Sequence, residues 1–118
     1  MSRWRSSLSR WASSERDEAL ELRKDTAKAG LVTIAEAPLR TPVTVQGTLK
    51  TVTLRPRGGV PALEAELYDG SGRLQVVWLG RRRIAGISAG TGIRVSGRIG
   101  GDVDELVMYN PRYALRPR

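Results

Sequence analysis

Apolar and polar residues alternate with a period of two in several short runs after Pro42. In the first run the apolar residues stand at odd positions as far as Leu49, whereas Val52 and Leu54 stand at even positions. Strict alternation is typical of a half-buried strand, and a one-residue slip exchanges the two faces of a strand. We therefore expect a β-bulge or a sharp coil near residues 50–51. A long strand that bends in this way can contribute to both halves of a small closed barrel.

Four more alternating runs follow, and they predict four further strands. A glycine-containing turn separates the second strand from the third, and another separates the fourth from the fifth, so each pair is typical of a hairpin. Between the pairs, residues 81–87 are long enough for a helical turn or two, and Ile84 and Ile87 are spaced to close one barrel end. The expected strands cover residues 63–68, 74–79, 93–99 and 105–109, and the turns cover residues 69–72 and 100–102.

The order of these elements predicts the fold class. A bent strand, a hairpin, a short helix and a second hairpin follow one another as in the OB fold, and five strands with turns every 8–12 residues independently favour a sandwich or barrel. We therefore predict an all-β protein with an N-terminal helix, in which residues 31–118 form a five-stranded OB-fold Greek-key barrel with a short helix between strands three and four. Trp78 has the parity of Leu74 and Val76, which predicts a core position.

Residues 1–30 have the signals of a basic helical extension. Ser13 or Ser14 is suited to the N-cap, Lys28 lies in the last turn, and Gly30 stands where a C′ glycine is expected. After this helix, residues 33–36 match a one-turn capping box.

Upstream of this helix, Trp4, Leu8 and Trp11 have helical spacing among three arginines, and this stretch is either helical or disordered. The two tryptophans either contact nucleic acid or a partner, or dock the helix onto the barrel.

The charge balance points to a polyanionic partner. The chain of 118 residues has 20 Lys and Arg against 12 Asp and Glu, a net charge of +8. Twelve of the basic and six of the acidic residues lie in residues 41–118, so most of the excess is on the predicted barrel. This balance favours nucleic acid first and an anionic membrane surface second. The alternative is a compositional bias toward arginine, since only three of the basic residues are lysines.

Several residue types are missing, and their absence excludes whole classes of function. There is no Cys and no His, which removes disulfides, thiolate nucleophiles, imidazole bases and the usual zinc ligands. Asp102, Asp104 and Glu105 are interpreted as a solvated turn and not as a cation site. No apolar run approaches the ~20 residues of a membrane span, and the N-terminus lacks the apolar core of a signal peptide. We expect a cytoplasmic protein that is not an enzyme and has no metal, no cofactor and no membrane contact.

Six short segments spread over residues 33–115 carry a resemblance to one known superfamily: residues 33–36, 43–49, 67–74, 77–80, 93–97 and 109–113. They are similar to OB-fold nucleic-acid-binding domains, in particular the tRNA-anticodon-binding type, the wedge domain of the bacterial branch-migration helicase RecG, and small stand-alone actinobacterial OB-fold proteins. The resemblance implies the barrel fold and, less specifically, nucleic-acid binding, because OB barrels also bind proteins and sugars. No helicase motor is present.

OB barrels bind ligands on the outer face of strands two and three, between the loops that join strands one–two and four–five. Glu64 and Glu66 are expected on the same face and repel phosphates, and Tyr68 is the one outward aromatic residue that the pattern places there. We therefore expect weak, salt-sensitive and largely non-specific binding of single-stranded DNA or RNA. The alternative is a protein-interaction or oligomerisation module that uses the barrel and the N-terminal tryptophan segment. The expected nucleic-acid contacts are Lys50, Arg55, Arg57, Tyr68, Arg73, Gln75 and Arg98.

Overall fold

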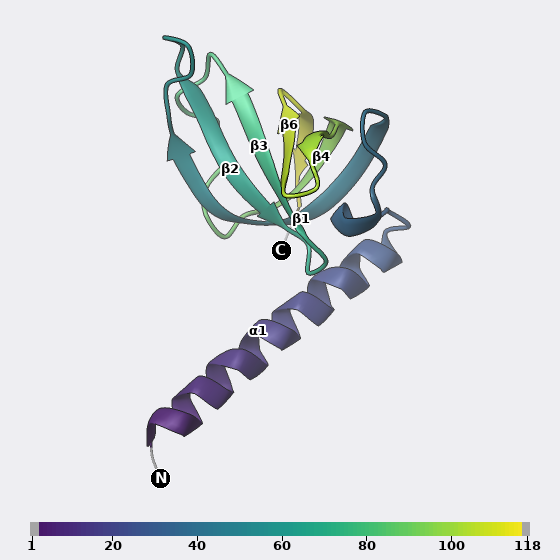
Figure 1. Cartoon of the computed structure of the whole chain (residues 1–118), viewed down its shortest axis with the longest axis vertical. Coiled ribbons are helices and arrows are strands. Elements are labelled where there is room, and N and C mark those ends of the chain that lie inside the picture. Colours follow the sequence, from purple (N-terminus) through teal and green to yellow (C-terminus); the bar gives the residue numbers. More distant parts are fainter. Residues whose placement is uncertain (1–2, 117–118) are drawn as a thin grey trace.

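The computed structural model describes residues 3–116, and the side chains of residues 10–116. It has one long N-terminal helix, a short 3-10 helix and seven strands that form one sheet (Figure 1). This confirms a β-rich protein with an N-terminal helix. The elements are α1 (Arg3–Lys28), η1 (Ile34–Glu36), β1 (Pro42–Leu54), β2 (Ala62–Tyr68), β3 (Arg73–Leu79), β4 (Gly92–Arg98), β5 (Gly100–Asp102), β6 (Glu105–Tyr109) and β7 (Arg112–Leu115).

The strands are ordered β5-β6-β3-β2-β1-β4-β7, and only the β3–β6 pair is parallel. The predicted count of five strands is wrong. Residues 100–102 were expected as a turn but pair with β6, and the chain resumes after Pro111 as β7, which pairs with β4. Hydrogen bonds do not close the sheet into a barrel, because its two outer strands, β5 and β7, do not pair with each other.

The predicted bulge in β1 is confirmed. Leu49 pairs with Leu67 and Thr51 pairs with Glu66, so Lys50 is the extra residue on β1. After the bulge the even-numbered residues of β1 take the core side, and Val52 packs against the core cluster. The first half of β1 pairs with β4 and the second half with β2, so one bent strand joins both parts of the sheet.

One face of the strands forms the core, as the alternation predicts. Trp78 is only 5% exposed, which confirms its core position, and its ring meets Tyr113 of β7 edge-on at 5.8 Å. Fifteen buried side chains form the main cluster, including Val45, Leu49, Leu67, Leu74, Val76, Ile84, Ile87, Ile93, Val95 and Met108.

The predicted helix between strands three and four is absent from the structure. Residues 80–91 form a series of turns, in which Gly80, Gly86 and Gly90 have positive φ angles of 77°, 84° and 90°. Glycine in the left-handed region at such short intervals interrupts any helix. Ile84 and Ile87 are nevertheless buried, as predicted, at 3% and 8% exposure.

α1 begins at Arg3, so an N-cap at Ser13 or Ser14 is wrong. The predicted end is confirmed: Gly30 has a φ of 72°, Gly30 N donates to Ala27 O, and Leu31 N donates to Thr26 O, as in a Schellman motif.

Only the C-terminal part of α1 lies beside the sheet, and the rest extends away from it (Figure 1). Ala19, Leu22 and Thr26 are buried there, and a Cβ on Gly70 would overlap the carbonyl of Ala19, so helix and hairpin approach closely. Trp11 is 64% exposed, which contradicts its docking on the sheet. The side chains of Trp4 and Leu8 lie outside the described residues.

The turn of the β2–β3 hairpin holds η1 in place, because Asp69 accepts from Ile34 N and Ser71 Oγ accepts from Ala35 N. Thr33 caps η1 by accepting from Glu36 N, as the capping box predicts. Asp69 is fully buried, and its carboxylate accepts from Ser71 N, Gly72 N and Ile34 N. Asp69 therefore stabilises the turn that was predicted at residues 69–72.

Candidate nucleic-acid interface

The register of the strands places a polar set of side chains on the outward face of the sheet. Across β1, β2 and β3, Thr51 pairs with Glu66, and Glu66 pairs with Gln75. Gln75 then pairs with Val107 on β6. All seven predicted contact residues lie on or beside this face and fall into two groups, one next to α1 and one at the other end of the strands.

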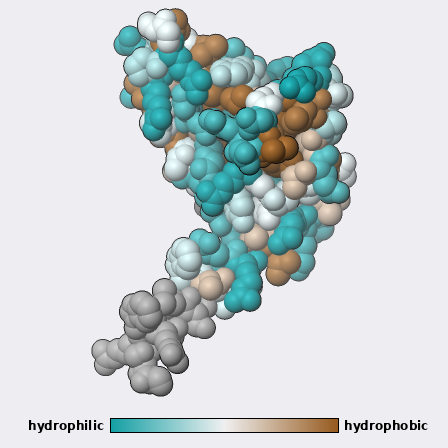
Figure 2. All heavy atoms as spheres, viewed as in Figure 1, coloured by the Kyte–Doolittle hydropathy of each residue, from teal (hydrophilic) through white to brown (hydrophobic). Residues whose placement is uncertain are grey.

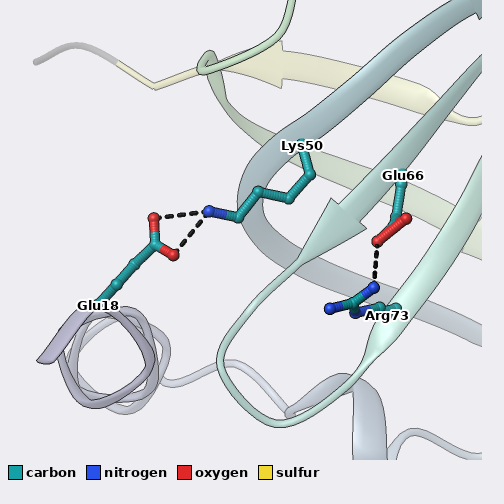
Figure 3. Close-up of polar contacts among 4 residues, drawn as sticks. All are labelled: Glu18, Lys50, Glu66 and Arg73. Atoms are coloured by element: carbon teal, nitrogen blue, oxygen red, sulfur yellow. Dashed lines mark hydrogen bonds and ion pairs between the residues drawn. The ribbon is translucent and has the colours of Figure 1, made fainter. Parts of the chain in front are cut away.

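We name the group next to α1 the Tyr68 cluster: Lys50, Tyr68, Arg73, Glu66 and Glu18. Lys50 Nζ lies 5.5 Å from the ring centroid of Tyr68, and the guanidinium of Arg73 lies 5.8 Å from it. Lys50 Nζ also lies 2.6 and 2.7 Å from the two carboxylate oxygens of Glu18, and Arg73 Nη1 lies 3.1 Å from Glu66 Oε1 (Figure 3). Each cation of the cluster therefore has a carboxylate partner.

The bulge and α1 together produce this arrangement. Lys50 is the extra residue of β1, and Glu18 faces it from the part of α1 that packs on the sheet (Figure 3). Glu15 also lines the hollow between helix and sheet. In this hollow two cations face three carboxylates, so a phosphate there meets an excess of negative charge.

We name the second group the Tyr109 groove: Arg40, Arg55, Arg57, Gln75, Arg98 and Tyr109. Three adjoining hollows share lining residues and make one path across the outward face. The path runs from Arg55 and Arg57, over Gln75 and Tyr109, to Arg98 and Arg40. It brings four of the predicted contacts onto one continuous surface and adds two residues that the sequence did not suggest, Tyr109 and Arg40.

Glu64 lies beneath this groove. It faces outward as predicted, yet its side chain is only 7% exposed. Arg57 Nε donates to it at 2.7 Å and Gln75 Nε2 donates at 3.0 Å. The hydrogen bond from Arg57 lowers the pKa of Glu64 below its ordinary value, and the same hydrogen bond raises the pKa of Arg57. The carboxylate therefore stays ionised and holds Arg57 and Gln75 in place.

Arg57 also contacts Tyr109. Its Nη1 donates to the Tyr109 hydroxyl at 3.1 Å, and its guanidinium carbon lies 5.8 Å from the ring centroid. Tyr109 is 48% exposed, so much of its ring is open to solvent. In the sequence, Tyr109 has the same parity as Glu105 and the opposite parity to Leu106 and Met108. This pattern could have predicted that the Tyr109 ring lies on the outward face.

The other predicted residues have simple surroundings. Arg98 Nη1 donates to the carbonyl of Arg40, and Arg55 forms no ion pair within the described part of the chain. Arg81, Arg82 and Arg83 are exposed in the turns after β3.

No group of side chains suited to hold a metal ion occurs between residues 10 and 116. Asp102 accepts from Asp104 N and Glu105 N, which is a turn geometry. Apolar side chains also reach the surface, as Figure 2 shows for one face. A separate apolar hollow lies between residues 34–39 and the β5–β6 turn, where Val103 is 85% exposed. Among residues 3–116 no helix is both long and apolar enough to cross a membrane.

No protein-family model matches the chain, and no curated protein is significantly similar to it.

Proposed function

We propose that this protein is an OB-type, non-catalytic nucleic-acid-binding protein, and that a single strand of DNA or RNA lies along the Tyr109 groove. Two features of the sheet support the OB type. Only Ile99 separates β4 from β5, so the two can be regarded as one bent strand. Such a strand would bring the two edges of the sheet toward each other, as in a barrel. The parallel pairing of β3 with β6 fits the same arrangement.

The observation that carries the functional proposal is the exposed ring of Tyr109 among arginines. Four arginines and three carboxylates line the groove, and one of those carboxylates, Glu64, is buried beneath Arg57. Single-strand binders combine a positive groove with aromatic rings on which bases stack, without reading the sequence. One main stacking residue and a small excess of charge support weak and salt-sensitive binding.

Fluorescence anisotropy with labelled single-stranded DNA and RNA tests this proposal. The affinity should fall as salt rises, because bound phosphates release counterions. Arg55→Gln should weaken binding by about two- to fivefold, whereas Arg16→Gln, the same charge change on the exposed face of α1, should not. Absence of binding at low salt, or affinity that does not change with salt, would contradict the proposal.

A second function is favoured by the exposure of Trp11. This residue lies in the N-terminal half of α1, and it is 64% exposed. Large exposed aromatic rings are enriched at protein interfaces. If this surface joins two copies, light scattering after size exclusion shows a dimer that Trp11→Ser converts to a monomer. A wild-type monomer at all tested concentrations would exclude self-association through Trp11.

A further inference from the structure

The outward face of β4 and β7 carries three arginines without carboxylate partners. Arg94 and Arg98 lie on the same side of β4, with Ser96 between them, and Arg112 of β7 pairs directly with Ser96. All three arginines are exposed, and none belongs to an ion pair of the described residues. We name this set, Arg94, Arg98 and Arg112, the β4–β7 arginine face.

Two of these arginines are held in place by neutral acceptors. Arg94 Nε and Nη2 donate to Gln46 Oε1 at 3.2 and 2.9 Å, and Gln46 is only 1% exposed. Arg98 Nη1 donates to the carbonyl of Arg40 at 3.1 Å. A carboxylate partner would cancel the positive charge, as it does for Lys50, whereas an amide or carbonyl oxygen orients the guanidinium and leaves its charge free.

Hydroxyl groups lie between these arginines. Thr44 and Ser96 share a hydrogen bond of 2.8 Å on the same outward face. Hydroxyls and oriented guanidinium groups are the side chains that most often contact phosphate oxygens. Arg94 and Arg98 are four positions apart on the strand, about 13 Å at the usual rise, so the face is longer than a single phosphate group.

We propose that the β4–β7 arginine face binds the phosphodiester backbone of a nucleic-acid strand after the strand leaves the Tyr109 groove at Arg98. The inference rests on the proposed function for the identity of the ligand, and Arg98 is the residue that lines both surfaces. The face contacts phosphates and has no aromatic platform for bases, so it adds affinity for long strands and no preference for sequence.

The test compares ligands of two lengths and one ligand without bases. Single-stranded DNA of six and of twenty nucleotides and inorganic polyphosphate are titrated against the wild type, Arg112→Gln and the double variant Arg94→Gln/Arg112→Gln, with Arg16→Gln as the matched control. The Arg112 side chain forms no hydrogen bond or ion pair in the described structure, so its variant should keep the fold even if loss of Arg94 disturbs Gln46. Circular dichroism checks the folding of each variant.

We expect Arg112→Gln to weaken binding of the 20-mer and of polyphosphate by roughly three- to tenfold and to leave the 6-mer unchanged. The salt slope for the 20-mer should fall by roughly 0.7 for each phosphate contact that is lost. If Arg112→Gln and Arg16→Gln behave alike with the 20-mer and with polyphosphate, the inference is wrong.

Failure of the proposed function gives a different result. If Tyr109→Ala has no effect on either DNA length while Arg112→Gln still weakens polyphosphate binding, the phosphate face stands and the groove assignment is wrong. If Tyr109→Ala weakens the 6-mer and the face variants match the control on every ligand, the groove stands and the face is wrong.

Discussion

The Tyr68 cluster and the Tyr109 groove contain the same types of residue and offer them differently to a ligand. Each has a tyrosine ring with a cation within 6 Å of its centroid and a carboxylate bound to that cation. In the Tyr68 cluster the carboxylates of Glu18 and Glu66, whose side chains are 42% and 25% exposed, bind the two cations (Figure 3). In the Tyr109 groove, which Asp102 and Glu105 also line, Glu64 is buried beneath Arg57. Arg98 and Arg40, which form no ion pair among the described residues, continue the path.

This difference shows that a count of charges along the sequence does not locate a binding surface. Lys50 and Arg73 are expected contacts by residue type, but their charges are cancelled by groups that a ligand would have to displace. Arg98 is held by a carbonyl oxygen and keeps its charge. The partner of each cation decides which of two similar surfaces attracts phosphate.

Removal of the two tyrosines should separate the two regions most strongly. Stacking of one base contributes about 1–3 kcal/mol, so Tyr109→Ala should weaken single-strand binding by about five- to 150-fold. Tyr68→Ala should weaken it less than about threefold. Anisotropy at low salt with one labelled oligonucleotide measures both. A larger loss for Tyr68→Ala would place the strand over the other cluster.

Substitution of Arg57 and of Arg73, one arginine from each region, should change the free energy of unfolding by different amounts. Arg57→Ala leaves the buried carboxylate of Glu64 with only the hydrogen bond from Gln75, and loss of one partner of a buried charged group costs about 1–3 kcal/mol. Arg73→Ala exposes only Glu66, so its effect on the free energy of unfolding should be small. Urea denaturation measures both variants. Equal stability of the two would mean that Glu64 finds another partner or becomes hydrated.

The pair of Arg57 and Glu64 should make stability depend on pH. Because its folded-state pKa lies below the ordinary value of 4.5, Glu64 stabilises the fold above that pH and loses this contribution as the pH falls through its lowered pKa. The stability difference between wild type and Arg57→Gln should therefore be largest near neutral pH and shrink below about pH 4.5. Urea midpoints at pH 7 and at acid pH check this, and a constant difference would refute it.

The smallest expected effect is at the helix. Glu18→Gln frees Lys50 from its carboxylate partner, and exposed ion pairs of this kind contribute about 0.2–1 kcal/mol. Affinity for single strands should rise up to about fivefold. Glu21→Gln, which removes the same charge from an exposed position of α1, is the matched control. An equal rise in both variants would show that net charge alone is responsible.

Local sequence signals correctly predicted those structural features whose formation depends on residues that are neighbours in the sequence. The shift of parity at residue 50 located the bulge, the capping box at residues 33–36 and Gly30 marked helix ends, and the glycine-containing run 69–72 identified the hairpin turn. The predictions failed where pairing partners are distant. Residues 100–102 have turn composition but pair with β6, and residues 112–115 have no alternation that distinguishes a strand from a tail.

The candidate site was predictable in part. Arg55, Arg57, Gln75 and Arg98 were expected from the strand pattern, and the structure brings them onto one path. Tyr109 was readable from the alternation of β6 but was not singled out. Burial of Glu64 could not be predicted, because it depends on Arg57 folding back over the strand from the β1–β2 loop.

The sequence by itself determined which side of each strand is buried, since a period of two assigns every residue to a face. It also determined the absence of Cys and His chemistry and the excess of positive charge. Only the tertiary structure decided where that charge is available. Glu18, the partner that cancels the charge of Lys50, is 32 residues away from it in the sequence. Gln46, the neutral acceptor that leaves the charge of Arg94 available, lies on another strand. Electrostatic interactions depend on distance in space, which the order of residues does not specify.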